Sequence, residues 1–317
     1  MNEIEIINNI KKIIKNPAAL KLNDDVFFDK KKSLVASIDT YNEKTHYMNF
    51  KYPDLIIKKA IRSSISDIIS KGVNPEYLLI SFSGSNKHFS ENNIKLILKS
   101  IKSEQKIYHF SLIGGDTTKS IKSSFTICAY GFSNKIIKRN KCQLNDDIYI
   151  TGNIGDSAVG LDFLRKKIKS SSKIEEYFVK KYFKPNIPFG FHKELHKFAN
   201  TSMDVSDGLI SDMKKLINNQ KLSFEIEVDK IPISKNLNIY LKKNNKKFLN
   251  FISKGDDYQV LFTSHKKNRS YISRLSKRID LKITAIGKIS NSYKKRIIVY
   301  NKKVIKPLNY SGYLHKF

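Results

Sequence analysis

Aspartates at strand ends and in turns of small residues are the side chains of this sequence that could do chemistry. The chain of 317 residues has only 29 acidic side chains against 59 Lys and Arg, so the positions of its acids are informative. The aspartates in such positions are Asp24, Asp25, Asp39, Asp67, Asp116, Asp156, Asp204, Asp207, Asp256 and Asp257. Each alone also fits a helix cap or a turn. As a group at one end of a sheet they would repel one another unless cations neutralise them, and short carboxylates with nearby hydroxyls suit Mg²⁺ better than zinc.

Glycine-rich turns near some of these aspartates are consistent with phosphate binding. Mg²⁺ is seldom caged by protein alone and usually brings phosphates with it. The turns at Gly114–Gly115 and Gly152–Gly155 can present backbone N–H groups to an anion. The sequence has no G-x-x-x-x-G-K-[ST], no G-x-G-x-x-G after a strand and no G-x-S-x-G, which argues against P-loop, dinucleotide-binding and nucleophile-elbow enzymes. What remains is a nucleotide site held mainly by carboxylates and metal ions.

Strands and helices alternate along the chain, which predicts an α/β fold. In the first half we expect helices over residues 4–14, 53–70 and 91–103, and strands over 33–38, 77–82, 108–113 and 125–132. In the second half we expect helices over 157–167 and 208–218, and strands over 147–151, 223–228, 258–263, 282–289 and 296–300. The charged stretch 133–145 interrupts this pattern, so we predict an N-terminal domain of residues 1–137 and a C-terminal domain of residues 138–317.

The overall composition predicts a globular, cytoplasmic protein. Hydrophobic residues make up 40% of the chain, enough for sizeable cores, and no stretch approaches the roughly 20 apolar residues of a membrane span. The N-terminus has neither a continuous apolar signal region nor a small-residue cleavage site. Cys128 and Cys142 are the only cysteines, too few for a disulfide scaffold or a cysteine-built zinc site.

The net charge of +30 leaves a nucleic-acid-binding function open as an alternative. The lysines are spread along the whole chain together with Asn and Ile, a pattern typical of nucleotide bias in an A/T-rich genome. No helix-turn-helix, RNP-like or Cys/His-finger pattern accompanies them. A salt titration of binding to random DNA separates the two interpretations, because phosphate contacts give a steep salt slope.

Eight segments resemble the thiamine-monophosphate kinase family, a branch of the aminoimidazole-ribonucleotide synthetase-like ATP-binding superfamily. They run in the family's order over nearly the whole chain: LNDDV at 22–26, SIDTYNEKTHY at 37–47, SISDIISKGVNPEYLLIS at 64–81, LIGGDTT at 112–118, DDIYITGNIGDSAVGL at 146–161, MDVSDGLISD at 203–212, KGDDYQVLFT at 254–263 and GYLHKF at 312–317. The resemblance implies ATP- and Mg²⁺-dependent phosphorylation of thiamine monophosphate to thiamine diphosphate.

The resemblance also implies an architecture and a set of ligands. It implies a two-domain α/β (α+β) fold whose N-terminal domain binds ATP and Mg²⁺ and pairs with its twin through its sheet in a homodimer. The C-terminal domain covers the nucleotide and contributes to the substrate site. Several Mg²⁺ ions, ATP as co-substrate and thiamine monophosphate are the expected ligands, with no membrane and no specific nucleic acid as partner.

Matching the family's motifs residue by residue implies three groups of site residues. The implied Mg²⁺ ligands are Asp25, Ser37, Asp39, Asp67, Asp116, Asp204 and Asp207. The implied ATP contacts are Gly115, Asp116, Arg139 and Ser206, and the implied thiamine monophosphate contacts are His46, Asp256 and Tyr313. Taken without the motifs, His46 and Arg139 also fit ordinary surface residues, and Tyr313 fits an aromatic that caps the core.

Three positions depart from the family's pattern. Asn23 stands where a glycine opens the first acidic motif, and Ile38 replaces a threonine before Asp39, which removes one hydroxyl metal contact. Asp256 is one methylene shorter than the usual glutamate, which puts its reach to the substrate in question. None of these changes removes the reaction.

The implied reaction needs no general base. A phosphate monoester is already an anionic oxygen nucleophile near neutral pH, so the barrier lies in bringing two polyanions together. Mg²⁺ between the phosphates would stabilise that charge. Another acceptor within the superfamily, such as a formylglycinamidine ribonucleotide or selenide, remains an alternative, although the His46 segment and the GYLHKF tail favour the thiamine branch.

Overall fold

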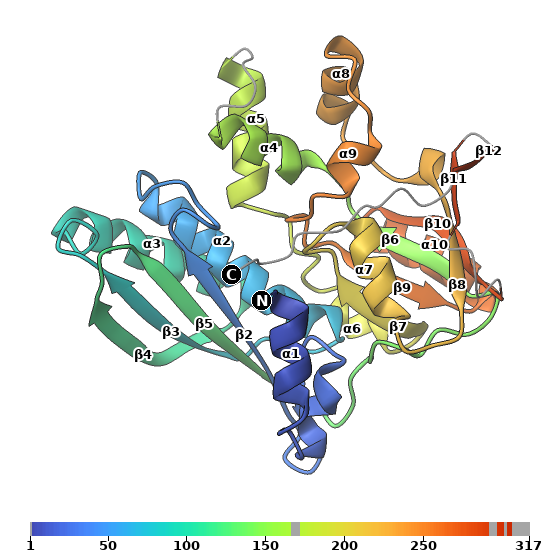
Figure 1. Ribbon diagram of the computed structural model, residues 1–317, viewed down its shortest axis with the longest axis horizontal. Coiled ribbons are helices and arrows are strands. Elements are labelled where there is room, and N and C mark those ends of the chain that lie inside the picture. Colours follow the sequence, from blue (N-terminus) through green and yellow to red (C-terminus); the bar gives the residue numbers. More distant parts are fainter. Residues whose placement is uncertain (1, 166–171, 292–296, 301–302, 306–317) are drawn as a thin grey trace.

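Two mixed β-sheets, each packed against helices, make up the computed structural model of the chain (Figure 1). The structure describes residues 2–165, 172–291, 297–300 and 303–305. The first sheet has five strands in the order β1-β2-β5-β3-β4, and the second has seven in the order β12-β11-β8-β10-β6-β9-β7. The predicted α/β fold class is therefore confirmed. Within the described ranges, no helix is both long and apolar enough to cross a membrane.

The first sheet comes entirely from the first half of the chain. Its strands and the surrounding helices are α1 (Glu3–Lys11), the 3₁₀ segment η1 (Pro17–Leu22), β1 (Phe27–Asp29), β2 (Leu34–Asn42), α2 (Pro53–Ser70), β3 (Tyr77–Gly84), α3 (Glu91–Tyr108), β4 (Ser111–Lys119) and β5 (Ser124–Phe132). The remaining elements are β6 (Asp147–Thr151), α4 (Asp156–Leu164), α5 (Ser172–Phe183), α6 (His192–Leu195), β7 (Ala199–Asp204), α7 (Leu209–Leu216), β8 (Ser223–Glu227), η2 (Val228–Lys230), α8 (Lys235–Lys243), α9 (Leu249–Ile252), β9 (Val260–Ser264), η3 (Lys266–Asn268), α10 (Arg269–Arg278), β10 (Ile283–Ser290), β11 (Ile297–Tyr300) and β12 (Lys303–Ile305).

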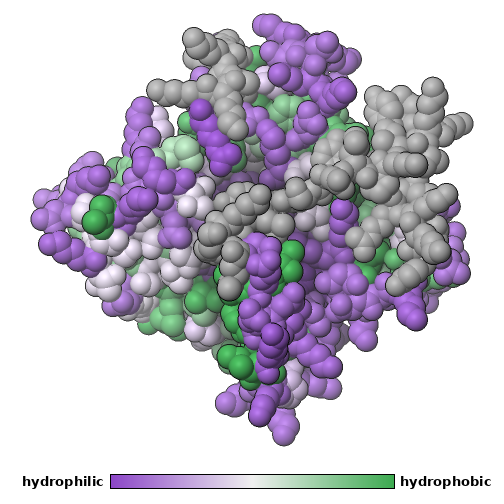
Figure 2. Space-filling model, viewed as in Figure 1, coloured by the Kyte–Doolittle hydropathy of each residue, from purple (hydrophilic) through white to green (hydrophobic). Residues whose placement is uncertain are grey.

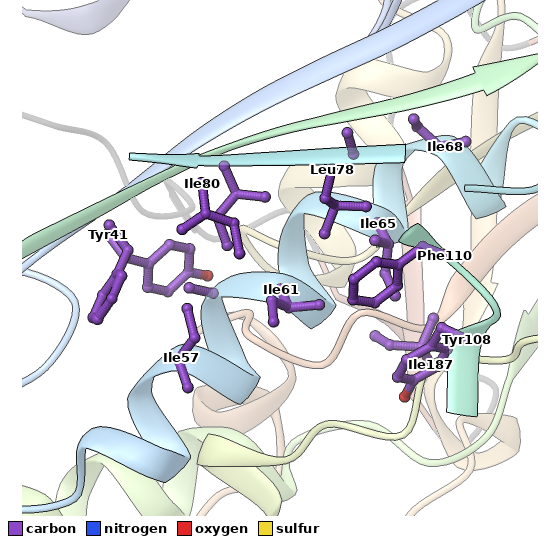
Figure 3. Packing of buried hydrophobic residues seen from close by; sticks show 14 of the residues in the cluster. Tyr41, Ile57, Ile61, Ile65, Ile68, Leu78, Ile80, Tyr108, Phe110 and Ile187 are labelled. Atoms are coloured by element: carbon purple, nitrogen blue, oxygen red, sulfur yellow. The ribbon is translucent and has the colours of Figure 1, made fainter. Parts of the chain in front are cut away.

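The α2 helix forms the centre of the first core. Pro53 lies in its first turn and Gly72 follows its end, as the sequence predicts. Its isoleucines recur at helical spacing and are at most 1% exposed: Ile56, Ile57, Ile61, Ile65, Ile68 and Ile69. Figure 3 shows this apolar side of α2 lying along β3, with Leu78 and Ile80 beside it. The helix thus covers one face of the five-stranded sheet.

The second half of the chain also contributes to this core. Tyr182 and Phe183 of α5 pack into it together with Ile187 and Tyr258, and Figure 3 shows Ile187 beside Tyr108. A division at residues 137/138 would therefore separate the two sheets but not their hydrophobic cores. That division stays a prediction.

The other face of the five-stranded sheet is exposed. Along β2 the buried Val35 and Tyr41 alternate with Ile38, which is 67% exposed. The aromatic Phe132 at the end of β5 is also exposed, and so is every residue of β4. Figure 2 shows white and green side chains over the lower left of the molecule, where β3, β4 and β5 lie in Figure 1. An apolar sheet face of this kind is typical of a surface that another protein covers.

Helices pack on both faces of the second sheet. Met213 of α7 lies in one core cluster with Ile148 of β6. Tyr149, the next residue of β6, belongs to a different cluster with Ile272 of α10. Successive strand residues point to opposite faces, so α7 and α10 cover opposite sides of this sheet.

Several expectations about the elements are wrong. Gly114 and Gly115 do not form a turn but lie inside β4, in register with β3. The predicted strand over 108–113 thus begins later and runs to Lys119.

The predicted helix over 4–14 ends at Lys11, and its apolar side chains Ile4 and Ile10 are 51% and 41% exposed, because it contacts mainly η1. The sequence ANTSMD of β7 was not expected to be a strand, since it has little apolar alternation.

A buried ion pair ties α2 to α3 and should stabilise the fold. Arg62 Nε lies 2.8 Å from Glu104 Oε2, the Glu104 side chain is fully buried, and Arg62 Nη1 donates to the Pro185 carbonyl oxygen at 2.8 Å. We expect Glu104→Gln to lower the free energy of unfolding by about 3 kcal/mol, because it leaves the guanidinium buried without its counter-charge. Urea unfolding measures this change.

The control is Glu91→Gln, which removes a carboxylate from the exposed Glu91–Lys95 pair at the start of the same α3 helix. Water screens an exposed pair, so this variant should lose little stability. Equal losses for the two variants would contradict the prediction.

Candidate active site

Carboxylates from three elements converge beside one cavity between the two sheets. Asp39 lies on β2, Asp67 on α2 and Asp204 at the end of β7, with Asp207 in the loop that follows. All four line a cavity of about 710 Å³. The structure therefore brings together four of the seven implied metal ligands, and Ser37 joins them through a hydrogen bond to Asp67.

Strand alternation and helical spacing direct these side chains toward one another. Ser37 and Asp39 point to the face of β2 that α2 covers, the face that also buries Val35. Ser37 Oγ donates to Asp67 Oδ2 at 2.5 Å, and Ser66 Oγ of α2 donates to Asp204 Oδ2 at 2.7 Å. Small hydroxyl side chains thus let the helix approach both sheets and give the buried carboxylates hydrogen-bond donors.

Burial and mutual repulsion raise the pKa values of Asp39, Asp67 and Asp204, the three carboxylates that we call the acidic cluster. Loss of water raises the pKa of Asp39 to about 6, and the charges of Asp25 and Asp207 act in the same direction. Burial raises the pKa of Asp204 to about 7, again with help from Asp25. The pKa of Asp67 lies well above its usual range because of burial and the nearby Asp204 and Asp39. Without a cation, the cluster therefore takes up protons near neutral pH.

Two basic residues hold Asp24 and Asp25 beside the cluster. Lys71 Nζ lies 2.7 Å from Asp24 Oδ1 and 2.6 Å from Asp25 Oδ2, and Arg139 Nη1 lies 3.5 Å from Asp25 Oδ1. The Arg139 backbone N–H also donates to Asp24 Oδ2 at 3.0 Å. Burial acts to raise the pKa of Asp25, but the charges of Lys71 and Arg139 outweigh it and lower that pKa to about 2. Asp25 and Arg139, a predicted metal ligand and a predicted ATP contact, are thus ion-pair partners.

A second lysine neutralises the loop after β7. Lys215 of α7 pairs with Asp207 and with Asp212, whose carboxylate accepts a hydrogen bond from the Asp207 backbone N–H at 3.0 Å. Burial raises the pKa of Asp212 to about 8. Sequence reasoning assigned Asp212 only to a helix and missed both Lys71 and Lys215, since nothing local distinguishes them from the many surface lysines.

The implied acceptor residues His46 and Asp256 line the same cavity. Asp256 Oδ1 lies 2.7 Å from the buried Lys59 Nζ of α2 and accepts from the Tyr258 hydroxyl at 3.1 Å. Burial lowers the pKa of Lys59 to about 8. The Tyr182 hydroxyl donates to the carbonyl oxygen of His46. Residues far apart in the sequence therefore line one wall of the cavity.

Of the remaining predicted contacts, the structure describes Ser206 but not Tyr313. Ser206 lines the cavity, and its carbonyl oxygen accepts from the Asp256 backbone N–H at 2.8 Å. This bond joins the 203–207 and 254–257 segments. Tyr313 lies outside the described residues.

Gly115 and Asp116 lie away from this cavity in the single chain. In the strand register Asp39 is opposite Ile127 of β5, Ile127 is opposite Ile80 of β3, and Ile80 is opposite Gly115 of β4. Gly115 is therefore three strands from Asp39, about 14 Å at the usual strand spacing. Asp116 points to the opposite, exposed face of the sheet, because side chains alternate along a strand.

The glycine-rich turn before α4 already holds a carboxyl group of the protein itself. The Gly155 backbone N–H donates to both carboxylate oxygens of Asp257 at 3.0 Å. Gly155 has a φ of 94°, in the region that favours glycine. Asp257 therefore caps the start of α4 in the place where the sequence suggested a phosphate.

The donor set of the acidic cluster fits a divalent cation with a preference for oxygen ligands. Asp39, Asp67, Asp204 and Ser37 offer carboxylate and hydroxyl oxygens, and the raised pKa values indicate that the cluster lacks compensating positive charge. Over residues 2–165, 172–291, 297–300 and 303–305, no three acidic, histidine or cysteine side chains enclose a metal position by themselves. An Mg²⁺ ion there would complete its shell with water or phosphate oxygens.

Known proteins resemble this chain in sequence and fold. Residues 15–133 match the family model described as AIR synthase related protein, N-terminal domain. The thiamine-monophosphate kinase of Buchnera aphidicola subsp. Schizaphis graminum is 32% identical and covers 96% of this chain and 96% of its own length.

Two solved structures extend the comparison to the fold. AaThiL complexed with AMPPCP and TMP is 26% identical, with a TM-score of 0.86 over 99% of this chain and 97% of its own. Thiamine monophosphate kinase from Aquifex aeolicus is 26% identical, with a TM-score of 0.82 over 96% of this chain and 98% of its own. With an end-to-end relative at 32% identity and an acidic cavity in the matching fold, this chain belongs to the thiamine-monophosphate kinase family.

Proposed function

We propose that this chain transfers the γ-phosphoryl group of ATP to thiamine monophosphate, giving ADP and thiamine diphosphate. The observation that carries the proposal is one cavity that Asp39, Asp67 and Asp204 share with His46 and Asp256. Membership of the family supports thiamine monophosphate over the other acceptors of the superfamily. The AMPPCP and TMP named for the AaThiL structure support a nucleotide and an acceptor bound together. A need for ATP is also why we expect a cytoplasmic location.

In this proposal the acidic cluster holds the phosphates and the rest of the cavity holds the acceptor. Asp39, Asp67, Asp204 and Asp207 would bind divalent cations, and Ser37 would orient Asp67 through its 2.5 Å hydrogen bond. Mg²⁺ bound there would supply charge neutralisation between the donor and acceptor phosphates. Ser206 would lie against the nucleotide.

The acceptor side combines aromatic rings with one carboxylate. Thiamine monophosphate carries a cationic thiazolium and an aromatic pyrimidine, which favour an aromatic face and a negative charge. Tyr41 and Tyr258, whose hydroxyl oxygens lie 2.5 Å apart, line the cavity next to His46 and Asp256. Tyr313 stays a prediction from the resemblance.

We further propose a homodimer formed through the exposed face of the five-stranded sheet. Ile38 and Phe132 leave an apolar surface there that a second copy could cover. Asp116 points to the same face, so it would take part in the site only through that interface. Gly115 stays an ATP contact that only the resemblance implies.

The first prediction from the proposed function concerns the reaction. Purified protein with ATP, Mg²⁺ and thiamine monophosphate should release ADP and form thiamine diphosphate, and EDTA should abolish both. Chromatography of the products with a panel of acceptors, including a formylglycinamidine ribonucleotide and selenide, measures this. Turnover in EDTA, or ADP release that depends on a different acceptor, would contradict the proposal.

The second prediction concerns pH. In metal-free protein, Asp39 and Asp204 have pKa values of about 6 and about 7, above the roughly 3.9 of an unfolded chain. The folded state then binds more protons than the unfolded state between about pH 4 and pH 7, so stability is highest at the acid end and falls as the pH rises. We expect the free energy of unfolding in EDTA to fall by on the order of 4 kcal/mol from pH 5 to pH 8.

Urea unfolding in EDTA at each pH measures this fall. Added Mg²⁺ should remove most of it, and Asp39→Asn should weaken it. The matched control is Asp147→Asn. Asp147 lies on β6, away from the acidic cluster, and its carboxylate pairs with Arg269 at 2.5 Å. The free energy of unfolding of that variant should fall with pH as much as that of the wild type. A free energy of unfolding that rises from pH 5 to pH 8 would contradict the raised pKa values of Asp39 and Asp204.

The third prediction concerns the dimer. Sedimentation should give a dimer for the wild type and a monomer for Ile38→Glu, because the new charge would be buried in the interface. Ile121→Glu is the control, since Ile121 is 89% exposed in the loop between β4 and β5. A monomeric wild type, or an Ile38→Glu variant that stays dimeric, would exclude this interface.

A further inference from the structure

A lysine ammonium lies among three oxygens at the edge of the acidic cluster. Lys71 Nζ is 2.6 Å from Asp25 Oδ2, 2.7 Å from Asp24 Oδ1 and 2.8 Å from the Ser202 carbonyl oxygen. These three acceptors match the three N–H groups of an ammonium. Asp24 and Asp25 come from the loop after η1, whereas Ser202 lies on β7 of the second sheet.

The ammonium has little freedom to leave this position. The Lys71 side chain is fully buried, unlike that of Lys215, which is 35% exposed and has room to turn toward solvent. Lys71 also caps the end of α2, where the chain turns through Gly72 with a φ of 79°. Moving its nitrogen would remove the closest cation from the buried carboxylates of Asp24 and Asp25, since Arg139 Nη1 is 3.5 Å from Asp25 Oδ1.

A metal ion on the same oxygens would compete with this nitrogen. Mg²⁺ binds carboxylate oxygens at about 2.0–2.1 Å, so an ion on the Lys71-bound oxygens of Asp24 and Asp25 would lie less than about 5 Å from the ammonium. Two buried positive charges at that separation repel strongly. The oxygens of Asp24 and Asp25 therefore serve either the lysine or a metal ion.

We propose that Lys71 is a built-in cation that takes the place of a metal ion at the Asp24–Asp25 end of the cluster. Divalent cations then bind only on the side of Asp39, Asp67 and Asp204, and Asp25 acts as an ion-pair partner rather than a metal ligand. This inference deepens the proposed function and rests on it, because it requires that the cluster bind divalent cations. It differs from what the resemblance implies for Asp25.

The test counts metal ions directly, without substrates. Bound Mn²⁺ is measured by electron paramagnetic resonance in the wild type, in Lys71→Met and in Lys58→Met. Lys71→Met should bind about one Mn²⁺ more per chain than the wild type, because the two carboxylates lose their counter-charge and become free to ligate a metal. Its melting temperature should be lower than wild type in EDTA and should rise more on adding Mn²⁺.

Lys58→Met is the matched control. Lys58 lies on the same α2 helix and pairs with Glu104 at 3.3 Å, outside the cluster. It should lose some stability but keep the wild-type number of Mn²⁺ ions. An unchanged Mn²⁺ count in a folded Lys71→Met protein would overturn the inference.

Asp25→Asn keeps the inference testable if Lys71→Met does not fold. The variant should keep the wild-type Mn²⁺ count if Asp25 is only an ion-pair partner, whereas a loss of one bound ion would overturn the inference. Absence of bound Mn²⁺ from the wild type would instead contradict the metal site of the proposed function. Failure of the inference and failure of the function are thus distinguished.

Discussion

Negative charge buried between two sheets is the constraint on which this structure depends. Asp39 and Asp67 from the first half of the chain face Asp204 from the second, and their burial raises the pKa of each. An apolar contact of similar size would hold the sheets together at least as well, since buried charge is costly to desolvate. Serine hydroxyls offset part of this cost at Asp67 and Asp204. The ammonium groups of Lys71 and Lys215 pair with the neighbouring Asp25 and Asp207. Such an arrangement is understandable as a binding site rather than as a stabilising contact.

The α2 helix has an apolar side and a polar side with different partners. Its isoleucines pack against the first sheet, while the polar residues between them contact the second half of the chain. Lys59 near its middle pairs with Asp256, and Lys71 at its end pairs with Asp25. These two ion pairs fix the helix at Asp256, in the cavity wall, and at Asp25, beside the acidic cluster. A shift of α2 would therefore disturb both binding regions together.

Local sequence patterns predicted the site residues whose position is set by a single helix or strand. The apolar run 33–38 placed Asp39 next to a strand, although β2 continues to Asn42 and includes it. Pro53 and Gly72 bounded α2. Asp204 was singled out by its motif, but its strand was not, because ANTSMD owes its extended form to pairing with β9 and not to apolar alternation. Gly114 and Gly115 were misassigned for a similar reason, since only the register with β3 shows them to be in a strand.

Long-range charge pairing could not be predicted at all. Lys71 follows a helix and precedes a glycine, as surface lysines often do. Its burial depends on Ser202, more than a hundred residues away. In a chain with 59 basic residues, composition gives no means of separating the few lysines that enter the site from those in solvent.

The direction in which Asp116 points has a consequence for how such an enzyme would behave in dilute solution. If a second copy covers the exposed sheet face, each site contains parts of two chains, and the fraction of complete sites follows mass action. Specific activity would then decline on dilution below the dissociation constant of the pair. In the cell, the reaction rate would rise more steeply than the protein concentration. At low expression, each copy of the protein would therefore contribute less activity.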